Sequence, residues 1–299
     1  MFHNILIIGC GLIGSSVLRG SFVRKISKNI FVYEKSKKNI SLIKKINKKT
    51  KFLNRLDSQI SKMDLIILCT HMNQYLSIIK KLQKFVSSKN IITDTGSTKR
   101  DIINLINRNK KIKDIFIPSH PIAGSEVSGP YHGNKNLFKN KWCIILDNKN
   151  KIKLKKVENF WKKLGSKIIF MNAIEHDKIF SITSHLPHLI AYNLVKTAMD
   201  FQKKNKHNII KYSAGGLRDF SRTAASNEIM WRDIFFSNKD NLIKSINIFV
   251  KNLNNFKNLI NKKNNKDIIK ILKSSKKVRK QIIDLKQDVP KPNFGRDIL

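Results

Sequence analysis

An apolar run that ends in three regularly spaced glycines most constrains this chain. Near the N-terminus it reads ILIIGCGLIGSS, so Gly9, Gly11 and Gly14 have the spacing G-x-G-x-x-G. In such a motif a buried strand ends at the first glycine, the second lets the backbone approach a pyrophosphate, and the third allows the next helix to pack closely. The N–H groups that open this helix, here those of Leu12 and Ile13, then face the phosphates. The pattern predicts a dinucleotide-binding strand–turn–helix unit.

Glu34 indicates which dinucleotide is bound. The second predicted strand, residues 29–34, ends at Glu34, about twenty residues beyond the glycines. A carboxylate there accepts hydrogen bonds from a ribose 2′-OH and repels a 2′-phosphate, which favours NAD. Two alternatives stay open: Glu34 is a solvated charge at a strand end, or the neighbouring Lys35, Lys37 and Lys38 tolerate the phosphate of NADP.

Length and charge narrow the class of protein. At 299 residues the chain is longer than a lone nucleotide-binding domain and favours two domains. Its formal charge of +40 raises the alternative of a nucleic-acid-binding protein. The basic residues are mostly Lys, scattered without a basic arm, an aromatic-interleaved stripe or a zinc pattern. We therefore expect incidental binding to polyanions and no dedicated nucleic-acid site.

The cysteines and the apolar runs indicate the compartment. Cys10, Cys69 and Cys143 lie singly in apolar segments, as buried thiols do in a reducing compartment, and form no disulfide or metal pattern. The first strand follows Met1 directly, which leaves no signal peptide, and no apolar run approaches the length of a membrane span. We expect a cytoplasmic protein with neither a metal site nor a membrane segment.

The order of elements predicts an α/β protein with two domains. Strands and helices alternate up to about residue 170, which is typical of a parallel sheet covered on both faces, and only helices follow. We predict a Rossmann-type parallel-sheet domain over residues 1–172, an all-α domain over 173–288 and an irregular tail over 289–299. Because the helices have wide apolar faces, we expect the second domain to form a homodimer.

The strands are predicted over residues 4–9, 29–34, 64–69, 90–93, 114–119, 142–146 and 167–170. The main helices are predicted over 12–22, 75–85, 175–203, around 209–225, over 231–256, and in a Lys-rich segment through residue 286. Pro187 lies within the helix 175–203, where we expect it to kink the helix and free backbone groups.

Polar segments follow three of these strands at the edge where parallel sheets bind ligands. They read CTH at 69–71, DTGSTK at 94–99 and SHPIAGSE at 119–126. His120, at a strand end beside the loop of Ser97, lies where a nicotinamide would be placed. The alternatives are a core or surface histidine for His120 and a helix N-cap for Ser97.

The helical part adds two candidate clusters. The segment SHLPH at 184–188 places two histidines around a proline, and GGLRDFSRT at 215–223 is followed by WRD at 231–233. Arginine is scarce in this Lys-dominated chain. Three arginines within a short span therefore indicate a site where a planar guanidinium binds an anionic group through two hydrogen bonds. The alternative is structural ion pairing, which we expect at least for Arg232. His176 and Asp177 could likewise form only a helix-start charge pair.

Together these segments resemble the prephenate dehydrogenase family, which includes the arogenate and cyclohexadienyl dehydrogenases of tyrosine biosynthesis. The motifs occur in the family's order and approximate spacing, through nearly the whole chain. They are G-x-G-x-x-G at 9–14, D-x-G-S-x-K at 94–99, HPIAG at 120–124, SHLPH at 184–188, and the segment from GG at 215–216 through Arg222 to WRD at 231–233. The resemblance implies a Rossmann-type domain, a helical dimerisation domain, and NAD-dependent oxidation and decarboxylation of prephenate to 4-hydroxyphenylpyruvate or of arogenate to tyrosine.

The resemblance also implies roles for individual residues. His120 would accept the proton of the substrate's 4-hydroxyl, and Ser97 would support that hydrogen bond and the nicotinamide. Arg222 would bind the ring carboxylate, with Ser184 and His188 also contacting the substrate. His176 and Asp177 would belong to a gating ion network at the pocket mouth. The implied cofactor contacts are Gly9, Gly11, Leu12, Ile13, Gly14, Glu34, Thr70, Asp94 and Gly96.

The motifs leave the side chain of the substrate open, since the family divides between keto-acid and amino-acid substrates. We expect the monofunctional form, because no chorismate-mutase segment precedes the first strand and too little chain follows the helices for a regulatory ACT module. Feedback by tyrosine would then act at the active site. Other Rossmann-plus-helices oxidoreductases, such as β-hydroxyacid dehydrogenases or pyrroline carboxylate reductases, are the alternative, but they do not explain His120 together with Arg222.

Overall fold

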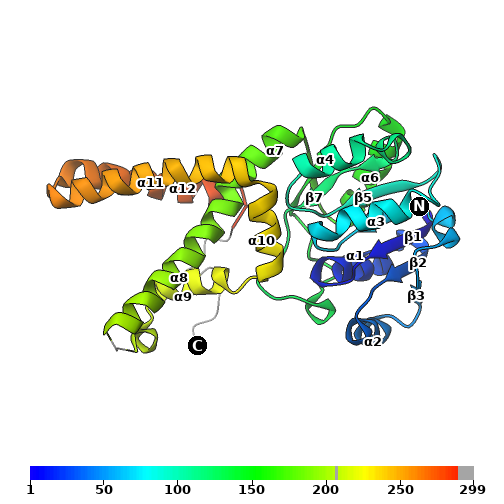
Figure 1. Ribbon diagram of the computed structural model, residues 1–299, viewed down its shortest axis with the longest axis horizontal. Helices are drawn as coiled ribbons and strands as arrows, with labels where there is room; N and C mark the ends of the chain where they lie inside the picture. The colour runs from blue at the N-terminus through cyan, green and yellow to red at the C-terminus, as the bar shows by residue number, and fades with distance from the viewer. Residues whose placement is uncertain (206–207, 289–299) are drawn as a thin grey trace. The chain divides into compact units, whose positions relative to one another are not determined.

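A six-stranded parallel sheet forms the centre of the N-terminal part of the computed structural model, which describes residues 1–205 and 208–288 (Figure 1). Its strand order is β3–β2–β1–β4–β5–β6, and every neighbouring pair is parallel. The strands are β1 (Phe2–Ile8), β2 (Ser27–Tyr33), β3 (Lys51–Phe52), β4 (Leu65–Leu68), β5 (Ile91–Asp94) and β6 (Phe116–Ile117). The predicted Rossmann-type domain is confirmed. Only the two-residue β3, which has no apolar run to mark it, was not predicted.

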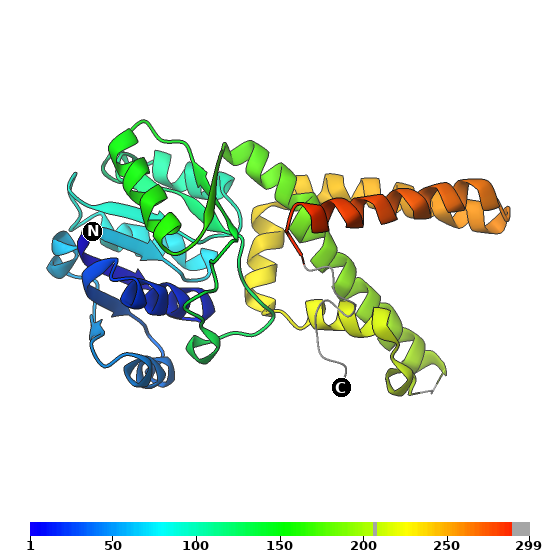
Figure 2. The ribbon, with the colours of Figure 1, turned by 180° about the vertical axis from the view of Figure 1, so that it is seen from behind.

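The sheet is buried on both faces because its strands alternate between two cores. Ile5 and Ile7 of β1 lie in one core, and Leu6 and Ile8 lie in the other. Helices α1 (Leu12–Val23) and α6 (Lys151–Lys163) close the first core, whereas α3 (Tyr75–Leu82) and α4 (Arg100–Asn107) close the second (Figures 1 and 2). A strand covered on both faces is apolar at every position, which explains the continuous run before Gly9.

The strand predicted over 114–119 is divided at Pro118, which has no N–H for a strand ladder. Its second half, β7 (Ser119–Pro121), starts a separate three-stranded sheet with β8 (Trp142–Leu146) and β9 (Lys167–Met171). Strand β8 is parallel to β9 but antiparallel to β7. The expectation of parallel pairing is therefore wrong at β7–β8. A loop with one short 3₁₀ turn joins these strands, whereas parallel neighbours need a crossover connection, usually a helix, that returns the chain to the end of the sheet where the first strand began.

The rest of the N-terminal part consists of short connecting elements. They are α2 (Lys37–Ile46), η1 (Ser58–Lys62), η2 (Met72–Gln74), α5 (Lys110–Lys113) and η3 (Pro130–His132).

Among the described residues after β9, all regular elements are helices, as predicted. They are α7 (Ala173–Phe180), α8 (Leu186–Asn205), η5 (Ile209–Tyr212), α9 (Gly215–Ala224), α10 (Glu228–Ser237), α11 (Lys239–Asn261) and α12 (Asn265–Asp284). The helix predicted over 231–256 is two helices, α10 and α11. They are separated at Asn238, whose buried side chain bonds to groups outside both helices.

A π-helical turn, η4 (Ser181–His185), joins α7 to α8 directly before Pro187. Proline cannot donate the backbone hydrogen bond that an α-helix needs, and a wider turn accommodates the loss. The disturbance predicted around Pro187 thus takes the form of a π turn, and such turns occur frequently at functional sites.

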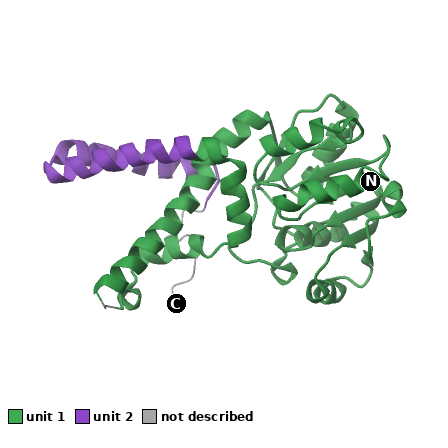
Figure 3. Ribbon diagram, in the orientation of Figure 1, with its two compact units in different colours: residues 1–242 green, residues 243–299 purple. Residues whose placement is uncertain are grey.

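The chain divides into two compact units, residues 1–242 and 243–299 (Figure 3). Within the first unit, α7 packs against α4, α10 against η2, and α8 against α9. The domain boundary predicted at residue 172 falls between β9 and α7, and the predicted tail 289–299 lies outside the described residues. Across the described ranges, no helix combines the length and apolar character that a bilayer span requires.

Candidate active site

The three glycines of the first loop each meet a different constraint. Gly9 has a φ of +84°, in the left-handed region that side chains rarely adopt. A Cβ on Gly14 would lie 2.2 Å from the carbonyl oxygen of Gly9, so α1 packs this closely only without a side chain there. A Cβ on Gly11 would meet no described atom within 4 Å, so this side of the loop is open.

The start of α1 is free to bind an anion. Gly11 is the N-cap, and no side chain caps the helix. The first N–H groups of a helix, here those of Leu12 and Ile13, have no partner within it. Open backbone at Gly11 beside these N–H groups fits a pyrophosphate.

Glu34 is fixed beside the same loop. The backbone N–H of Cys10 donates to Glu34 Oε2 at 2.9 Å, and that of Ser36 donates to Oε1 at 2.9 Å. Each carboxylate oxygen keeps a further acceptor site, so Glu34 can still bind ribose hydroxyls. Thr70 lies on the other side of the loop, where its Cγ2 would be 2.6 Å from a Cβ on Gly9.

A buried ion pair shapes the loop that carries Ser97. Lys99 Nζ donates to Asp94 Oδ2 at 2.7 Å, and both side chains are 0% exposed. The backbone N–H of Gly96 also donates to Oδ2, and that of Ser119 donates to Oδ1. Burial lowers the pKa of Lys99, and the Asp94 carboxylate opposes this shift. The side chain of Asp94 therefore holds the 94–99 loop against β7.

Ser97 itself leaves its hydroxyl available. Its side chain is half-buried and makes no hydrogen bond within the part of the chain that the structure describes. The alternative that Ser97 caps the following helix is not observed, because the N-cap of α4 is Lys99. The next residue, Thr98, lies with its Oγ1 2.7 Å from Ser237 Oγ of α10, so the loop also contacts the helical part.

His120 lies on β7 and is 9% exposed. Its Nδ1 is 2.9 Å from His176 Nε2, and its ring packs against Phe180. Its Nε2 has no hydrogen-bond partner among the described residues, and this atom is not fully buried. Burial lowers the pKa of His120 well below its usual value of 6.5, and electrostatic interactions with His176, Lys99 and His185 lower it further. The imidazole is therefore neutral near pH 7, as a general base must be.

His176 and Asp177 lie fully buried on α7, and His176 contacts His120. His176 Nδ1 is 2.8 Å from Asp177 Oδ1. The same carboxylate accepts the backbone N–H groups of Lys99 at 2.8 Å and Arg100 at 2.9 Å, so it caps α4 from another helix. The resemblance implies a gating ion network at the pocket mouth for this pair, and the structure places both side chains in the interior, 0% exposed.

The pKa values of this pair follow from the same contacts. Burial alone would raise the pKa of Asp177, but the hydrogen bonds from His176 and the two amides outweigh it and hold this pKa below its usual range. Burial lowers the pKa of His176, and the bond to Asp177 only partly opposes this. Near neutral pH the pair is therefore a carboxylate bonded to a neutral imidazole.

The π turn and α8 present two more histidines. His188 Nδ1 donates to the carbonyl oxygen of Ser184 at 2.9 Å, and its ring stacks on Trp231 with 3.7 Å between centroids. His185 is 1% exposed and its Nδ1 is 3.1 Å from Asn238 Nδ2. Burial lowers the pKa of His185 to about 4. Ser184 is half-buried beside them.

Arg222, on α9, forms an ion pair with Glu126 at 3.6 Å. Glu126 lies in the loop that follows β7, so this pair connects the strand of His120 to the helical part. The side chain of Arg222 stays 42% exposed, which leaves N–H donors for a ligand. The neighbouring Arg232 instead pairs with Asp233 at 2.7 Å, the structural ion pair that we expected.

Two groups of predicted residues are thus joined by direct contacts. Asp94 and Gly96 are linked to the strand of His120, His120 contacts His176, and His176 is bonded to Asp177. Ser184 and His188 form a second group on the π turn and α8. Within the described residues, neither Arg222 nor His188 forms a hydrogen bond or an ion pair with His120.

Sequence reasoning missed three residues that hold the site. Lys99 and Asp94 are the two ends of the D-x-G-S-x-K segment, so this motif could have indicated their ion pair. Glu126 ends the segment that follows His120, but nothing in the sequence links it to the distant Arg222. Asn238, which donates to the carbonyl of Asp177 at 2.7 Å, had no signal, since its role depends on where α10 ends.

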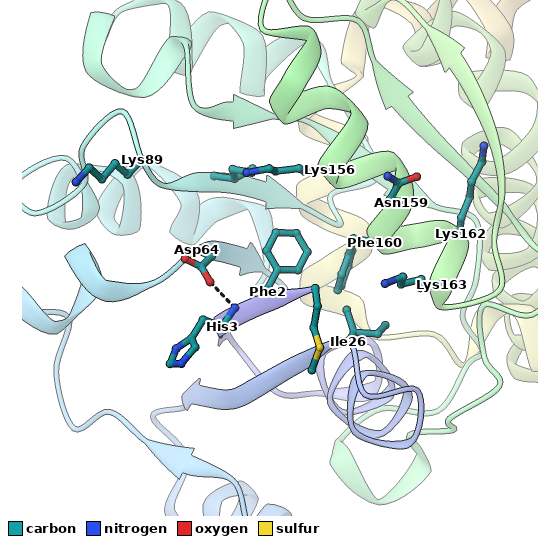
Figure 4. A pocket seen from close by; sticks show the side chains of 12 residues that line it. Phe2, His3, Ile26, Asp64, Lys89, Lys156, Asn159, Phe160, Lys162 and Lys163 are labelled. Carbon is teal, nitrogen blue, oxygen red and sulfur yellow. Dashed lines mark hydrogen bonds between the residues drawn. The ribbon is translucent and has the colours of Figure 1, made fainter.

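Two cavities lie away from these residues. One, of about 600 Å³, is at the amino ends of the strands, opposite the loops described above (Figure 4). Phe2, Ile26 and Phe160 contribute apolar surface to it, and Lys89 and Lys156 are among its lysines. Within the described ranges no cluster of three potential metal ligands occurs.

A glycine loop with an uncapped helix start, and a buried neutral histidine beyond the neighbouring strands, define a Rossmann-type nucleotide-dependent dehydrogenase with a helical second part. Two family models match in succession. "Prephenate dehydrogenase, nucleotide-binding domain" covers residues 20–170, and "Prephenate dehydrogenase, dimerization domain" covers residues 172–274. The chain belongs to the prephenate dehydrogenase family.

Individual relatives agree with this assignment. The cyclohexadienyl dehydrogenase of Zymomonas mobilis is 30% identical over 93% of this chain and 96% of its own length. The prephenate dehydrogenase of Lactococcus lactis is 31% identical over 92% of this chain and 76% of its own. The crystal structure of prephenate dehydrogenase from A. aeolicus with hydroxyphenyl propionate and NAD⁺ has a TM-score of 0.87 and 32% identity, covering 94% of this chain and 99% of that one.

The glycines provide a matched test of the cofactor loop. Gly14→Ala places a methyl group 2.2 Å from the Gly9 carbonyl, so we expect the free energy of unfolding to fall by about 1–3 kcal/mol. Gly11→Ala meets open space, so we expect stability within about 1 kcal/mol of the wild type, but weaker binding of NAD. Chemical denaturation without cofactor and NAD titration separate the two effects. Equal stability of both variants would contradict this account.

Proposed function

We propose that this protein catalyses the NAD-dependent oxidative decarboxylation of prephenate to 4-hydroxyphenylpyruvate, of arogenate to tyrosine, or of both. The observation that carries the proposal is His120, a neutral, buried imidazole with one ring nitrogen free, placed beside the Ser97 loop at the edge of a nucleotide-binding sheet. Membership of the prephenate dehydrogenase family supports this reaction.

The cofactor would be held by the loop of Gly9, Gly11 and Gly14, with its pyrophosphate at the N–H groups that open α1. Glu34 would accept hydrogen bonds from the ribose, and its negative charge disfavours a 2′-phosphate. When bound, NAD accepts the hydride that leaves the substrate. Thr70 and Gly96 contribute the neighbouring loop walls.

His120 would act as the general base. The substrate ring carries a hydroxyl at C4 and a carboxylate at the opposite end. As the hydride leaves C4, the hydroxyl becomes a carbonyl, and its proton passes to His120 Nε2. Loss of the carboxylate as CO₂ then leaves the electron pair of the broken C–C bond in an aromatic phenolate, which drives the step forward. His120 returns its proton to the phenolate oxygen and becomes neutral again. Ser97, with its hydroxyl unpaired in the described structure, would donate or accept a hydrogen bond at the same oxygen.

Arg222 would bind the ring carboxylate. Its guanidinium is partly exposed, and its partner Glu126 is 3.6 Å away, too far for a strong hydrogen bond. A substrate carboxylate can therefore take up donors that Glu126 leaves free. Ser184 and His188 would contact the substrate side chain, with His188 oriented by its bond to the Ser184 carbonyl and its stacking on Trp231.

The working form would be a homodimer, as the name of the second matching domain suggests. In the single chain, apolar side chains of the helical part stay uncovered. Leu194, Phe201 and Phe236 are 39%, 55% and 72% exposed. Burying such surface against a second copy is the usual way in which helices of this kind are stabilised. The three cysteines are all free, which fits a reducing compartment such as the cytoplasm.

Turnover is tested with the purified protein, NAD and each substrate in turn. We expect NADH absorbance to rise with prephenate, with arogenate or with both, and one equivalent of CO₂ to be released per NADH. The ratio of kcat/KM for the two substrates identifies the preferred side chain. Absence of NADH with both would reject the proposed function.

Two substitutions separate the role of His120 as the base from the role of Arg222 in binding the ring carboxylate. His120→Asn removes the proton acceptor, so we expect kcat to fall by about 10²–10⁴-fold with little change in KM. Arg222→Gln removes a partly exposed charge partner, so we expect KM to rise by roughly 30-fold, equivalent to about 2 kcal/mol, with a smaller change in kcat. Steady-state kinetics at saturating NAD distinguishes them. Full turnover by His120→Asn would show that another group is the base.

The pH profile follows from the burial of His120. The base is active only when neutral, so activity is lost as pH falls through its pKa, which burial holds well below 6.5. We expect kcat/KM to be nearly constant between pH 6.5 and 8 and to decline only at lower pH. A midpoint above 6.5 for the acidic decline would contradict the assignment of His120 as a buried neutral base.

A further inference from the structure

A chain of three buried groups ends at His120. Its Nδ1 is 2.9 Å from His176 Nε2, and His176 Nδ1 is 2.8 Å from Asp177 Oδ1. His176 and Asp177 are 0% exposed, so no solvent competes for these bonds. Phe180 packs against both imidazole rings and restricts their relative orientation. Its ring centroid lies 4.6 Å from that of His176 and 5.0 Å from that of His120.

The direction of each hydrogen bond follows from Asp177. Its oxygens already accept the backbone N–H groups of Lys99 and Arg100, which can only donate. Three donors around a carboxylate stabilise the ionised form, and an ionised carboxylate has no proton to give. His176 Nδ1 must therefore carry a proton and donate it to Asp177.

The next bond is then fixed as well. A neutral imidazole carries one N–H, and in His176 that proton is on Nδ1. His176 Nε2 is therefore an acceptor, so the nitrogen that faces it, His120 Nδ1, must be the donor. With its only proton on Nδ1, neutral His120 keeps a lone pair on Nε2, the nitrogen that has no protein partner among the described residues.

We infer that His176 is a positioning residue: anchored by Asp177, it holds His120 in the Nδ1–H tautomer and so makes Nε2 the basic nitrogen that receives the substrate proton. This inference rests on the proposed function, because it assigns a purpose to the tautomer through that reaction. It replaces the gate that the sequence implied for His176 and Asp177 with a role behind the base.

The proton balance is simple. During hydride transfer one proton moves from the substrate hydroxyl to His120 Nε2. Once CO₂ has left, the same proton returns from Nε2 to the phenolate oxygen and gives the phenol of the product. The Nδ1 proton stays on His120 throughout and remains bonded to His176 Nε2. The imidazolium that forms is stabilised because its Nδ1–H faces an acceptor whose far nitrogen donates to a carboxylate. Asp177 and His176 keep their own protonation states throughout, as a buried carboxylate does when it orients a catalytic imidazole.

Without His176 the tautomer would no longer be held. An isolated neutral histidine side chain favours the proton on Nε2, and this form has no lone pair directed at the substrate. The position of one buried acceptor therefore decides whether His120 is a base or a donor.

The first experiment needs no variant of His176. Protein labelled with [¹⁵N]histidine is studied without substrate by long-range ¹H–¹⁵N correlation near pH 7.5, where protonated and unprotonated ring nitrogens have distinct shifts. The signals absent from His120→Asn assign His120. We expect a protonated Nδ1 and an unprotonated Nε2. The opposite tautomer in the wild type would overturn the inference, whatever the outcome of the activity assays.

The second experiment compares two substitutions at one position. His176→Phe keeps an aromatic ring against Phe180 but removes the acceptor, and His176→Gln keeps an amide oxygen that can accept from His120 Nδ1. We expect His176→Phe to lower kcat by about 10- to 100-fold with KM changed less than about threefold, and to shift the His120 signals toward the Nε2–H form. We expect His176→Gln to retain the Nδ1–H form and most of the rate.

These outcomes separate the inference from the proposed function. Wild-type protein with the expected tautomer but no turnover of either substrate would reject the function and leave the hydrogen-bond assignment standing. Turnover that is equally low in His176→Phe and His176→Gln, with unchanged His120 signals in both, would show that His176 serves only packing and would overturn the inference. Should His176→Phe fail to fold, the wild-type and His176→Gln spectra still decide the tautomer.

Discussion

The carboxylate of Asp177 is the contact on which the site depends. It is fully buried, yet it is satisfied by three donors: two amides that open α4 and the imidazole of His176. An isolated buried carboxylate would cost several kcal/mol, so this arrangement persists only while all three donors are in place. Because the donors come from both the sheet part and α7, one carboxylate joins the Ser97 loop to His176 and, through it, to the imidazole of His120. Asn238 adds a fourth link through the Asp177 carbonyl.

A second buried charge pair, Lys99 with Asp94, sits on the other side of the same loop. Asp94 reaches the backbone of Ser119, the residue before His120, while the backbone of Lys99 reaches Asp177. Buried ion pairs contribute little net stability, but removing one partner strongly destabilises the protein, because the other charge is left buried and unpaired. Their value here is geometric: they fix the 94–99 loop, β7 and α7 relative to one another, which places Ser97 and His120 at one edge of the sheet.

Much of the fold was readable from local patterns. The run before Gly9 is apolar at every position because β1 is covered on both faces, and the spacing of the three glycines reports backbone constraints that only glycine meets. The predicted bounds of the long apolar strands and helices agree with the observed bounds to within a few residues. The exceptions have local causes that periodicity does not report: Pro118 divides one strand, Asn238 divides one helix, and β8 returns antiparallel through a loop. The two-residue β3 is too short for any periodicity.

The sequence by itself determined the nucleotide-binding unit, the helical second part and the residue types of the site, because glycine geometry, strand burial and scarce histidines and arginines leave marks in a linear chain. It did not determine which of those residues touch. His120 and His176 are 56 positions apart, and Lys99 and Asp177 are 78 apart. Only the packing of α7 against α4 brings them together. That packing places His176 and Asp177, for which the resemblance implies a gating network at the pocket mouth, in the interior beside His120 and Lys99. No local pattern encodes such contacts between distant segments.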